Sequence, residues 1–217
     1  MSNRIKQTEE FLKMKFQEGT YFKINEDAKN YRLEHSYRVA NIGKVIAERE
    51  GFNVEAFVIS CLLHDVSYCL EYENDADWAN HGRCSAKIAR PFLESIGMEK
   101  QLIEEICYGI AIHVDDKSDF EGVRTPFAVS VGDADNIDRF DAFRIYDNLK
   151  YMNFDKMNLS DKKEKVNSML ERLNKYKSLS FGTKTATEMW KEKIGFQIEF
   201  FNNLREQLNN SEAVEGI

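Results

Sequence analysis

The sequence predicts an all-α protein. It contains only two prolines in 217 residues, and apolar residues recur at spacings of three, four and seven along most of the chain. The strict alternation of apolar and polar residues that is typical of strands is nearly absent. Hydrophobic residues make up 42% and charged residues 31%, which is an ordinary balance for a globular chain with one sizeable core.

The first helices are delimited by glycine and asparagine. A helix over residues 6–18 is expected to stop at Gly19, and a second over residues 32–50 to stop at Gly51, a residue typical of helix C-termini. Asn53 is placed to cap the next helix, which runs into the sequence "CLLHD".

The later helices follow the same pattern. They are expected over residues 80–97, 99–113 and 125–151, and Pro91 is expected to kink or divide the first of these. Near the C-terminus, Asp161 with Glu164 and Thr185 with Glu188 have the spacing of capping boxes.

The polar stretch "YMNFDKMNLS", residues 151–160, is the weakest joint in the chain. We therefore expect a core over residues 1–150 and a C-terminal group of helices, residues 151–217, that packs on it. The last helix carries an apolar stripe that includes Trp190, Ile194 and Phe201. This stripe is expected to close the core within the chain, and the alternative is a homodimer.

Composition also restricts the classes of partner and compartment. No apolar run approaches the roughly 20 residues that span a bilayer, and the N-terminus lacks the apolar segment of a signal peptide. The net charge of −7 argues against binding nucleic acid. The four cysteines form no C-x-x-C pair, which favours reduced thiols in a cytoplasmic protein.

Histidine and aspartate side chains continue the apolar stripes of several helices. His35 lies four residues before Val39, and His113 lies three residues after Ile110. Asp65 follows Val58, Cys61 and Leu62 at spacings of seven, four and three, and Asp135 lies four residues after Val131. Polar groups on inward faces must be paired, hydrogen-bonded or bound to a metal, because uncompensated burial costs several kcal/mol.

Each of these residues also has a purely structural interpretation. A lone histidine on an apolar face is often a core residue, an aspartate near a helix end is often a cap, and His81 could simply be exposed. Together, however, four helices each deliver a side chain of the ligand type, and no histidine of the four in the chain is left over. Imidazole with carboxylate is the ligand set of Mn, Fe, Ni, Co or Zn. Adjacent side chains diverge by about 100° on a helix, so His64 and Asp65 can share one metal only if the helix ends there.

The order of these residues resembles the HD superfamily of metal-dependent phosphohydrolases. The resemblance rests on His35 in "HSYRV", the doublet in "CLLHDV" and Asp135 in "DADNID", and it covers roughly residues 31–146. It implies an HD-domain helical bundle with additional C-terminal helices. The flanking pattern is most similar to small stand-alone bacterial HD proteins, some of which are similar to nucleotide pyrophosphohydrolases. Asp133 competes with Asp135 for the place of the last ligand.

Some branches of the superfamily bind two metals through an extended pattern, which His81 and His113 fit. The resemblance then implies one metal bound by His35, His64, Asp65 and Asp135, and a second bound by Asp65, His81 and His113. Single-metal members often keep histidines at these places to touch phosphate. The resemblance therefore implies one or two divalent ions (Mn, Fe, Ni, Co, Mg or Zn) and leaves their number open.

The resemblance implies hydrolysis of a phosphate ester or anhydride of a small molecule, most plausibly a nucleotide, by a metal-activated hydroxide. Asp65 and Arg38 are the expected catalytic residues, and Arg38, Lys117 and Arg139 are the candidates for binding substrate phosphate, with solvated charges as the alternative for all three. The alternative function is a non-catalytic, metal-containing regulatory protein that binds a nucleotide.

Overall fold

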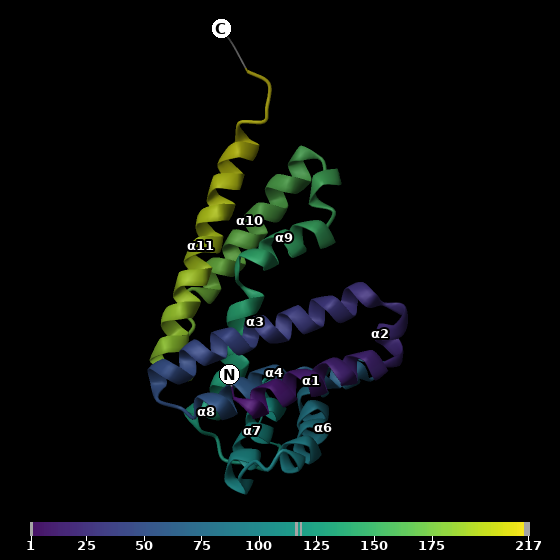
Figure 1. Ribbon diagram of the computed structural model, residues 1–217. Coiled ribbons are helices and arrows are strands. Elements are labelled where there is room, and N and C mark those ends of the chain that lie inside the picture. The colour runs from purple at the N-terminus through teal and green to yellow at the C-terminus, as the bar shows by residue number, and fades with distance from the viewer. Residues whose placement is uncertain (1, 116, 118, 215–217) are drawn as a thin grey trace. The chain divides into compact units, whose positions relative to one another are not determined.

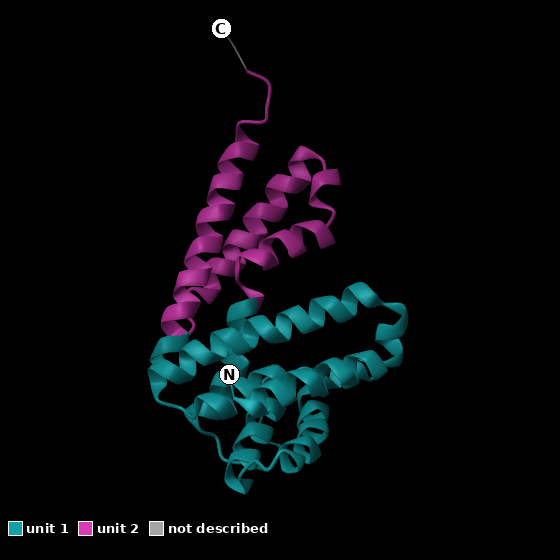
Figure 2. Cartoon of the chain, viewed as in Figure 1, with its two compact units in different colours: residues 1–138, 181–186 teal, residues 139–180, 187–217 magenta. Residues whose placement is uncertain are grey.

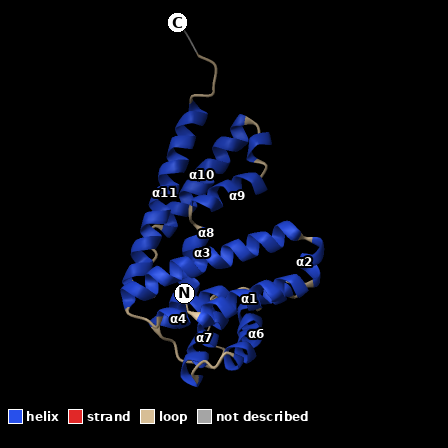
Figure 3. Cartoon of the chain, in the orientation of Figure 1, coloured by secondary structure: helices blue, strands red, loops and turns tan. Residues whose placement is uncertain are grey.

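The computed structural model describes residues 2–115, 117 and 119–214, and these residues form helices and loops without a strand (Figures 1 and 3). The prediction of an all-α fold is thereby confirmed. Within this described part, no helix is both long enough and apolar enough to cross a membrane. Two short 3-10 helices, η1 (Val66–Cys69) and η2 (Phe154–Lys156), accompany the α-helices. The α-helices are α1 (Asn3–Glu18), α2 (Thr20–Ile24), α3 (Glu26–Glu50), α4 (Val54–Leu63), α5 (Asp75–Ala79), α6 (His81–Ser95), α7 (Lys100–Ile112), α8 (Pro126–Arg139), α9 (Ala142–Tyr151), α10 (Leu159–Tyr176) and α11 (Lys184–Asn209).

The chain divides into two compact units (Figure 2). Unit 1 consists of residues 1–138 and 181–186, and unit 2 consists of residues 139–180 and 187–217. The expected packing of residues 151–217 on the core stays a prediction.

Helix α4 forms the centre of unit 1. Every residue from Ala56 to Leu63 is buried, and α1, α3 and α7 all pack against this helix. A helix that is apolar on all sides is stable only when it is covered on all sides. His64 and Asp65, which follow the last turn of α4, therefore lie in the interior of the unit.

Local signals in the sequence set the C-terminal end of α3 and the N-terminal end of α4 as predicted, although α3 begins at Glu26 rather than near residue 32. Gly51 has a φ of +73° and donates its N–H to Ala47 O, which closes α3 in a left-handed conformation that costs glycine little. The side chain of Asn53 accepts a hydrogen bond from the Ala56 N–H at 3.1 Å and caps α4.

The helix expected over residues 125–151 is two helices, α8 and α9, with a break at residues 140–141. Three further expectations are corrected. Pro91 lies inside α6, so the helix is not divided there, and the kink that was the other expectation stays a prediction. Asn158 caps α10 by accepting from Asp161 N at 2.9 Å, and Thr183 Oγ1 accepts from Ala186 N at 3.1 Å at the start of α11. The helices α10 and α11 thus begin two or three residues before the predicted capping boxes. In each helix an earlier polar side chain already accepts a hydrogen bond from a backbone N–H of the first turn.

The segment 181–186 returns the chain to unit 1. The Gly182 N–H donates to Asp133 Oδ2 at 2.9 Å, and the Thr185 N–H donates to Glu50 Oε1 at 2.8 Å. In unit 2, Trp190 is buried, and the centroid of its ring lies 4.8 Å from that of Phe140.

Glycines allow α6 and α8 to approach the end of α7. A Cβ atom on Gly82 would lie 2.8 Å from Ala111 O and 3.1 Å from His113 Nδ1, and a Cβ on Gly132 would lie 2.9 Å from His113 O. The position of His113 therefore depends on two glycines from neighbouring helices.

We predict that Gly82→Ala destabilises the protein by about 1–3 kcal/mol, because its methyl group meets backbone carbonyl atoms that cannot rotate away. Gly195→Ala in α11 is the matched control. No heavy atom beyond its own helix lies within 4 Å of a Cβ there, so we expect a gain of about 0.5–1 kcal/mol from lower backbone entropy in the unfolded chain. Urea unfolding followed by circular dichroism measures both changes. Equal stability of Gly82→Ala and the wild type would contradict the close approach of α6 and α7.

Candidate metal centre

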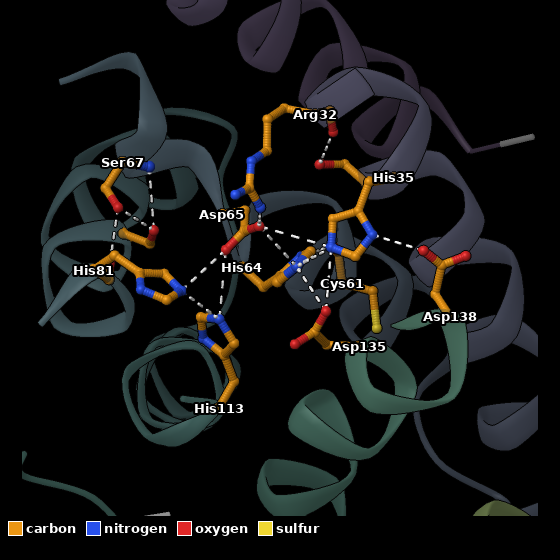
Figure 4. Close-up of polar contacts among 12 residues, drawn as sticks. Arg32, His35, Cys61, His64, Asp65, Ser67, His81, His113, Asp135 and Asp138 are labelled. Carbon is orange, nitrogen blue, oxygen red and sulfur yellow. Dashed lines mark hydrogen bonds and ion pairs between the residues drawn. The ribbon is translucent and has the colours of Figure 1, made fainter. Parts of the chain in front are cut away.

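Five helices of unit 1 deliver six ligand-type side chains to one place (Figure 4). His64 and Asp65 follow the end of α4, and the other four come from separate helices. Five of the six are at most 7% exposed, and His81 is half-buried. The positions are His35 in α3, His81 at the start of α6, His113 just after α7, and Asp135 in α8.

The doublet that follows α4 turns both of its side chains inward because the helix ends there. His64 keeps helical backbone angles, with φ −55° and ψ −36°, whereas Asp65 departs to φ −108° and ψ 15° before η1 begins. His64 and Asp65 can share one metal only if the helix ends at this point, and this change of backbone direction shows that it does.

The first cluster of ligand atoms consists of two imidazoles and two carboxylates. His35 Nε2 lies 3.2 Å from His64 Nε2 and 3.1 Å from Asp135 Oδ1. Asp65 Oδ2 lies 3.7 Å from His35 Nε2 and 3.5 Å from His64 Nε2.

The second cluster uses the other oxygen of Asp65. Asp65 Oδ1 lies 3.2 Å from His81 Nε2 and 3.5 Å from His113 Nε2, and these two nitrogens are 3.1 Å apart. Figure 4 shows the carboxylate between the two groups of imidazoles. The geometry therefore brings together all six residues that the sequence predicted as metal ligands, with Asp65 shared.

Every imidazole at the site directs its Nδ1 atom to an acceptor. His35 Nδ1 lies 2.7 Å from Asp138 Oδ2. The other three contact the carbonyl oxygen three residues earlier in the chain, at 2.5–2.7 Å. An acceptor on Nδ1 fixes the tautomer that carries its proton there, so the lone pair of a neutral imidazole lies on Nε2 and faces the site.

Facing lone pairs repel one another unless a proton or a cation lies between them. The spacings fit a cation, because two ligands bound about 2.1 Å from one ion lie roughly 3–3.5 Å apart. The sets His35–His64–Asp135 and His64–Asp65–His113 are both compact enough for this. The donor types and their separations therefore suit one or two divalent ions.

A proton takes the place of the cation in the metal-free protein. Burial acts to lower the pKa of His35, but hydrogen bonds to Asp135 and Asp138 outweigh it and raise this pKa to about 9. Burial lowers the pKa of His64 to about 4. Burial works against ionisation of Asp65 and Asp135 as well, but the neighbouring imidazoles hold the pKa of both carboxyls below the usual range.

The structure separates the two candidates for the last ligand. Asp135 Oδ1 lies 3.1 Å from His35 Nε2, whereas Asp133 Oδ2 accepts from the Gly182 N–H. Asp135 thus belongs to the cluster by geometry, and Asp133 holds the segment that returns to unit 1.

The three cations that the sequence proposed for phosphate have different surroundings. Arg38 donates from Nε and Nη2 to Asp138 at 2.7 and 3.2 Å. Lys117 is 70% exposed and lies 3.4 Å from Asp115. Arg139 is exposed at the end of α8. Contact of any of them with substrate stays a prediction.

Two residues at the site were missed by the sequence analysis. Arg32 donates from Nη1 to Asp65 Oδ2 at 2.8 Å, and Asp138 links His35 to Arg38. Arg32 lies three residues before His35 and Asp138 three residues after Asp135. Helical spacing from the proposed ligands could therefore have identified both.

Comparisons with known proteins agree with this geometry. The model of the HD domain family matches residues 32–142, about half of the chain. The chain therefore belongs to the HD domain family, the superfamily of metal-dependent phosphohydrolases that the order of its histidines and aspartates resembles.

Two relatives show how far the likeness extends. An uncharacterized protein of Clostridium beijerinckii is 34% identical over 101 residues, which are 45% of this chain and 62% of that protein. The match thus spans less than two thirds of the relative's length. The crystal structure of a predicted HD superfamily hydrolase from an uncultured Thermotogales bacterium has a TM-score of 0.59 and 21% identity over 91% of each chain. At this identity the likeness shows the fold.

We predict that the affinity for Mn²⁺ rises at least about tenfold per pH unit between pH 6.5 and 8.5. The raised pKa of about 9 means that His35 carries a proton through this range in the metal-free protein, and an ion can bind only the neutral imidazole, so binding must release that proton. Calorimetric titration in buffers of different ionisation enthalpy measures both the affinity and the protons released. An affinity independent of pH, with no proton release, would contradict the assignment of His35 as a ligand.

We also predict that Asp138→Asn weakens Mn²⁺ binding about 10- to 100-fold, because the carboxylate orients His35 and increases the basicity of its ring. Asp161→Asn, an exposed aspartate in α10, is the matched control and should bind Mn²⁺ like the wild type. The same titration at a fixed pH compares the variants. Unchanged affinity in Asp138→Asn would show that the His35–Asp138 contact does not support the site.

Proposed function

We propose that this protein is a phosphohydrolase that uses one or two divalent ions to cleave a phosphate ester or anhydride of a nucleotide. The observation that carries the proposal is the sharing of Asp65 between two pairs of imidazoles whose Nε2 atoms lie 3.1 and 3.2 Å apart. A buried carboxylate with one ligand atom facing each pair is the arrangement expected of a bridging ligand.

The side chains present fit the ions that the family implies. His35, His64, Asp135 and one oxygen of Asp65 would hold one ion, and the other oxygen of Asp65 with His81 and His113 would hold a second. When bound, such ions lower the pKa of water and neutralise phosphate charge.

The protein itself supplies orientation and positive charge. Hydrogen bonds at Nδ1 fix each imidazole, so that the ligand set needs little rearrangement to accept an ion. Arg32 lies 2.8 Å from Asp65, and its side chain is 25% exposed, so it is a further candidate for contacting a phosphate oxygen at the site. Arg38, Lys117 and Arg139 are further candidates for stabilising charge on the transferred phosphoryl group.

The test is phosphate release from a panel of nucleoside mono-, di- and triphosphates in the presence of Mn²⁺. We predict that Asp65→Ala lowers kcat by at least about 100-fold, because it removes the shared ligand and the charge stabilisation that depends on it. Asp27→Ala, an exposed aspartate in the first turn of α3, is the matched control and should turn over like the wild type.

Two other outcomes would overturn the enzyme proposal. If the wild type binds Mn²⁺ and nucleotide but releases no phosphate, the protein is a nucleotide-binding regulator rather than a hydrolase. If wild type and Asp65→Ala release phosphate equally, the activity does not arise at this site.

A further inference from the structure

Three aromatic side chains form a cluster beside the second group of imidazoles. Tyr68 belongs to η1, Tyr72 follows it, and Trp78 lies on α5. Their ring centroids are 5.1–5.6 Å apart, and Trp78 remains 45% exposed. We call Tyr68, Tyr72 and Trp78 the aromatic platform.

The aromatic platform is directly connected to the metal centre. The ring of Tyr68 lies 5.0 Å from that of His81, and the carbonyl oxygen of Trp78 accepts the Nδ1–H of His81 at 2.5 Å. The guanidinium of Arg32, which also contacts Asp65, covers Tyr68 at 3.6 Å from the ring centroid. Tyr68 and Trp78 thus both contact His81, one of the candidate metal ligands.

Hydrogen bonds hold the aromatic platform in place. The hydroxyls of Tyr72 and Ser67 are 2.6 Å apart, and Ser67 Oγ donates to His81 O at 2.8 Å. Asn74 caps α5 by accepting from the backbone N–H groups of Ala76 and Asp77. The short helix that carries Trp78 is therefore held in place before a ligand binds. Little conformational entropy would be lost when a ligand contacts the exposed part of the indole.

The spacing of the rings decides what they can bind. An aromatic cage for a cation needs rings on several sides of the ion, each within about 6 Å of it. The three centroids lie no more than 5.6 Å from one another, so the rings contact each other and leave no room for an ion between them. The exposed indole suits a planar ring stacked on its outer surface, as bases stack on aromatic side chains in proteins.

We propose that Trp78, supported by Tyr68 and Tyr72, stacks on the nucleobase of the substrate and selects nucleotides over sugar phosphates and inorganic polyphosphates. This inference rests on the proposed function, because it assigns the substrate class of the same site.

Binding is tested by tryptophan fluorescence of the Mn²⁺-loaded protein. The four nucleoside monophosphates are compared with ribose 5-phosphate, which has the same sugar phosphate without a base. The other tryptophan, Trp190, is 2% exposed, so quenching reports on Trp78. We expect quenching by at least one nucleotide and none by ribose 5-phosphate, and no quenching in Trp78→Phe.

Affinity and turnover provide the second readout. We predict that Trp78→Ala weakens binding of the preferred nucleotide about 10-fold and leaves that of ribose 5-phosphate unchanged, whereas Trp78→Phe keeps most of the affinity. Both substitutions retain the backbone carbonyl that accepts from His81, so metal content should stay at the wild-type level. If Trp78→Ala loses metal, Trp78→Leu, which keeps most of the bulk but removes the aromatic ring, takes its place, and the same loss of nucleotide affinity is expected.

The outcomes separate this inference from the proposed function. Base-dependent quenching without phosphate release from any compound would support the aromatic platform and overturn the hydrolase. Metal-dependent phosphate release would support the hydrolase. If Trp78→Ala then weakens the binding of nucleotide and of ribose 5-phosphate equally, or weakens neither, the aromatic platform is overturned. Equal affinity of the wild type for ribose 5-phosphate and every nucleotide would also overturn it.

Discussion

The charge of Asp65 is the constraint on which the rest of unit 1 depends. This carboxylate is 3% exposed, and an ionised carboxylate in such a place is strongly destabilising unless its charge is offset and its oxygens are hydrogen-bonded. Compensation comes from α3, which contributes Arg32 and His35, and from the ends of α4, α6 and α7. The residues that compensate the charge are thus the residues that fix how these helices meet.

Metal binding and stability are linked through the same charges. Asp65, Asp135 and Asp138 are all at most 7% exposed, and in the metal-free protein Arg32, Arg38 and the protonated His35 offset them. A divalent ion would replace the proton with a larger charge at the centre of the cluster. These charges would keep the ligands close to the arrangement that an ion requires, which would reduce the reorganisation on binding.

Local patterns predicted the long helices of the first 113 residues but not the short helices α2 and α5, and they placed most of the candidate ligands on inward faces. His35, Asp65 and Asp135 lie on inward stripes, and each stripe is contained within one helix. The predicted capping boxes were wrong because Asn158 and Thr183, only two or three residues earlier, can also cap a helix. Spacing alone does not tell which of two such residues is the cap. The pairing of Arg38 with Asp138 joins residues 100 positions apart, so no local pattern contains it. The aromatic platform likewise depends on how a polar loop folds back on itself.

The return of residues 181–186 to unit 1 has a consequence for the order of folding during synthesis. Asp133 and Glu50 receive backbone hydrogen bonds from Gly182 and Thr185, which are made after the whole of 139–180. The unit that carries the metal centre therefore cannot acquire its final contacts when its first 138 residues leave the ribosome. It must wait until residues 139–186 have emerged, so this unit does not mature strictly from the N-terminus onward.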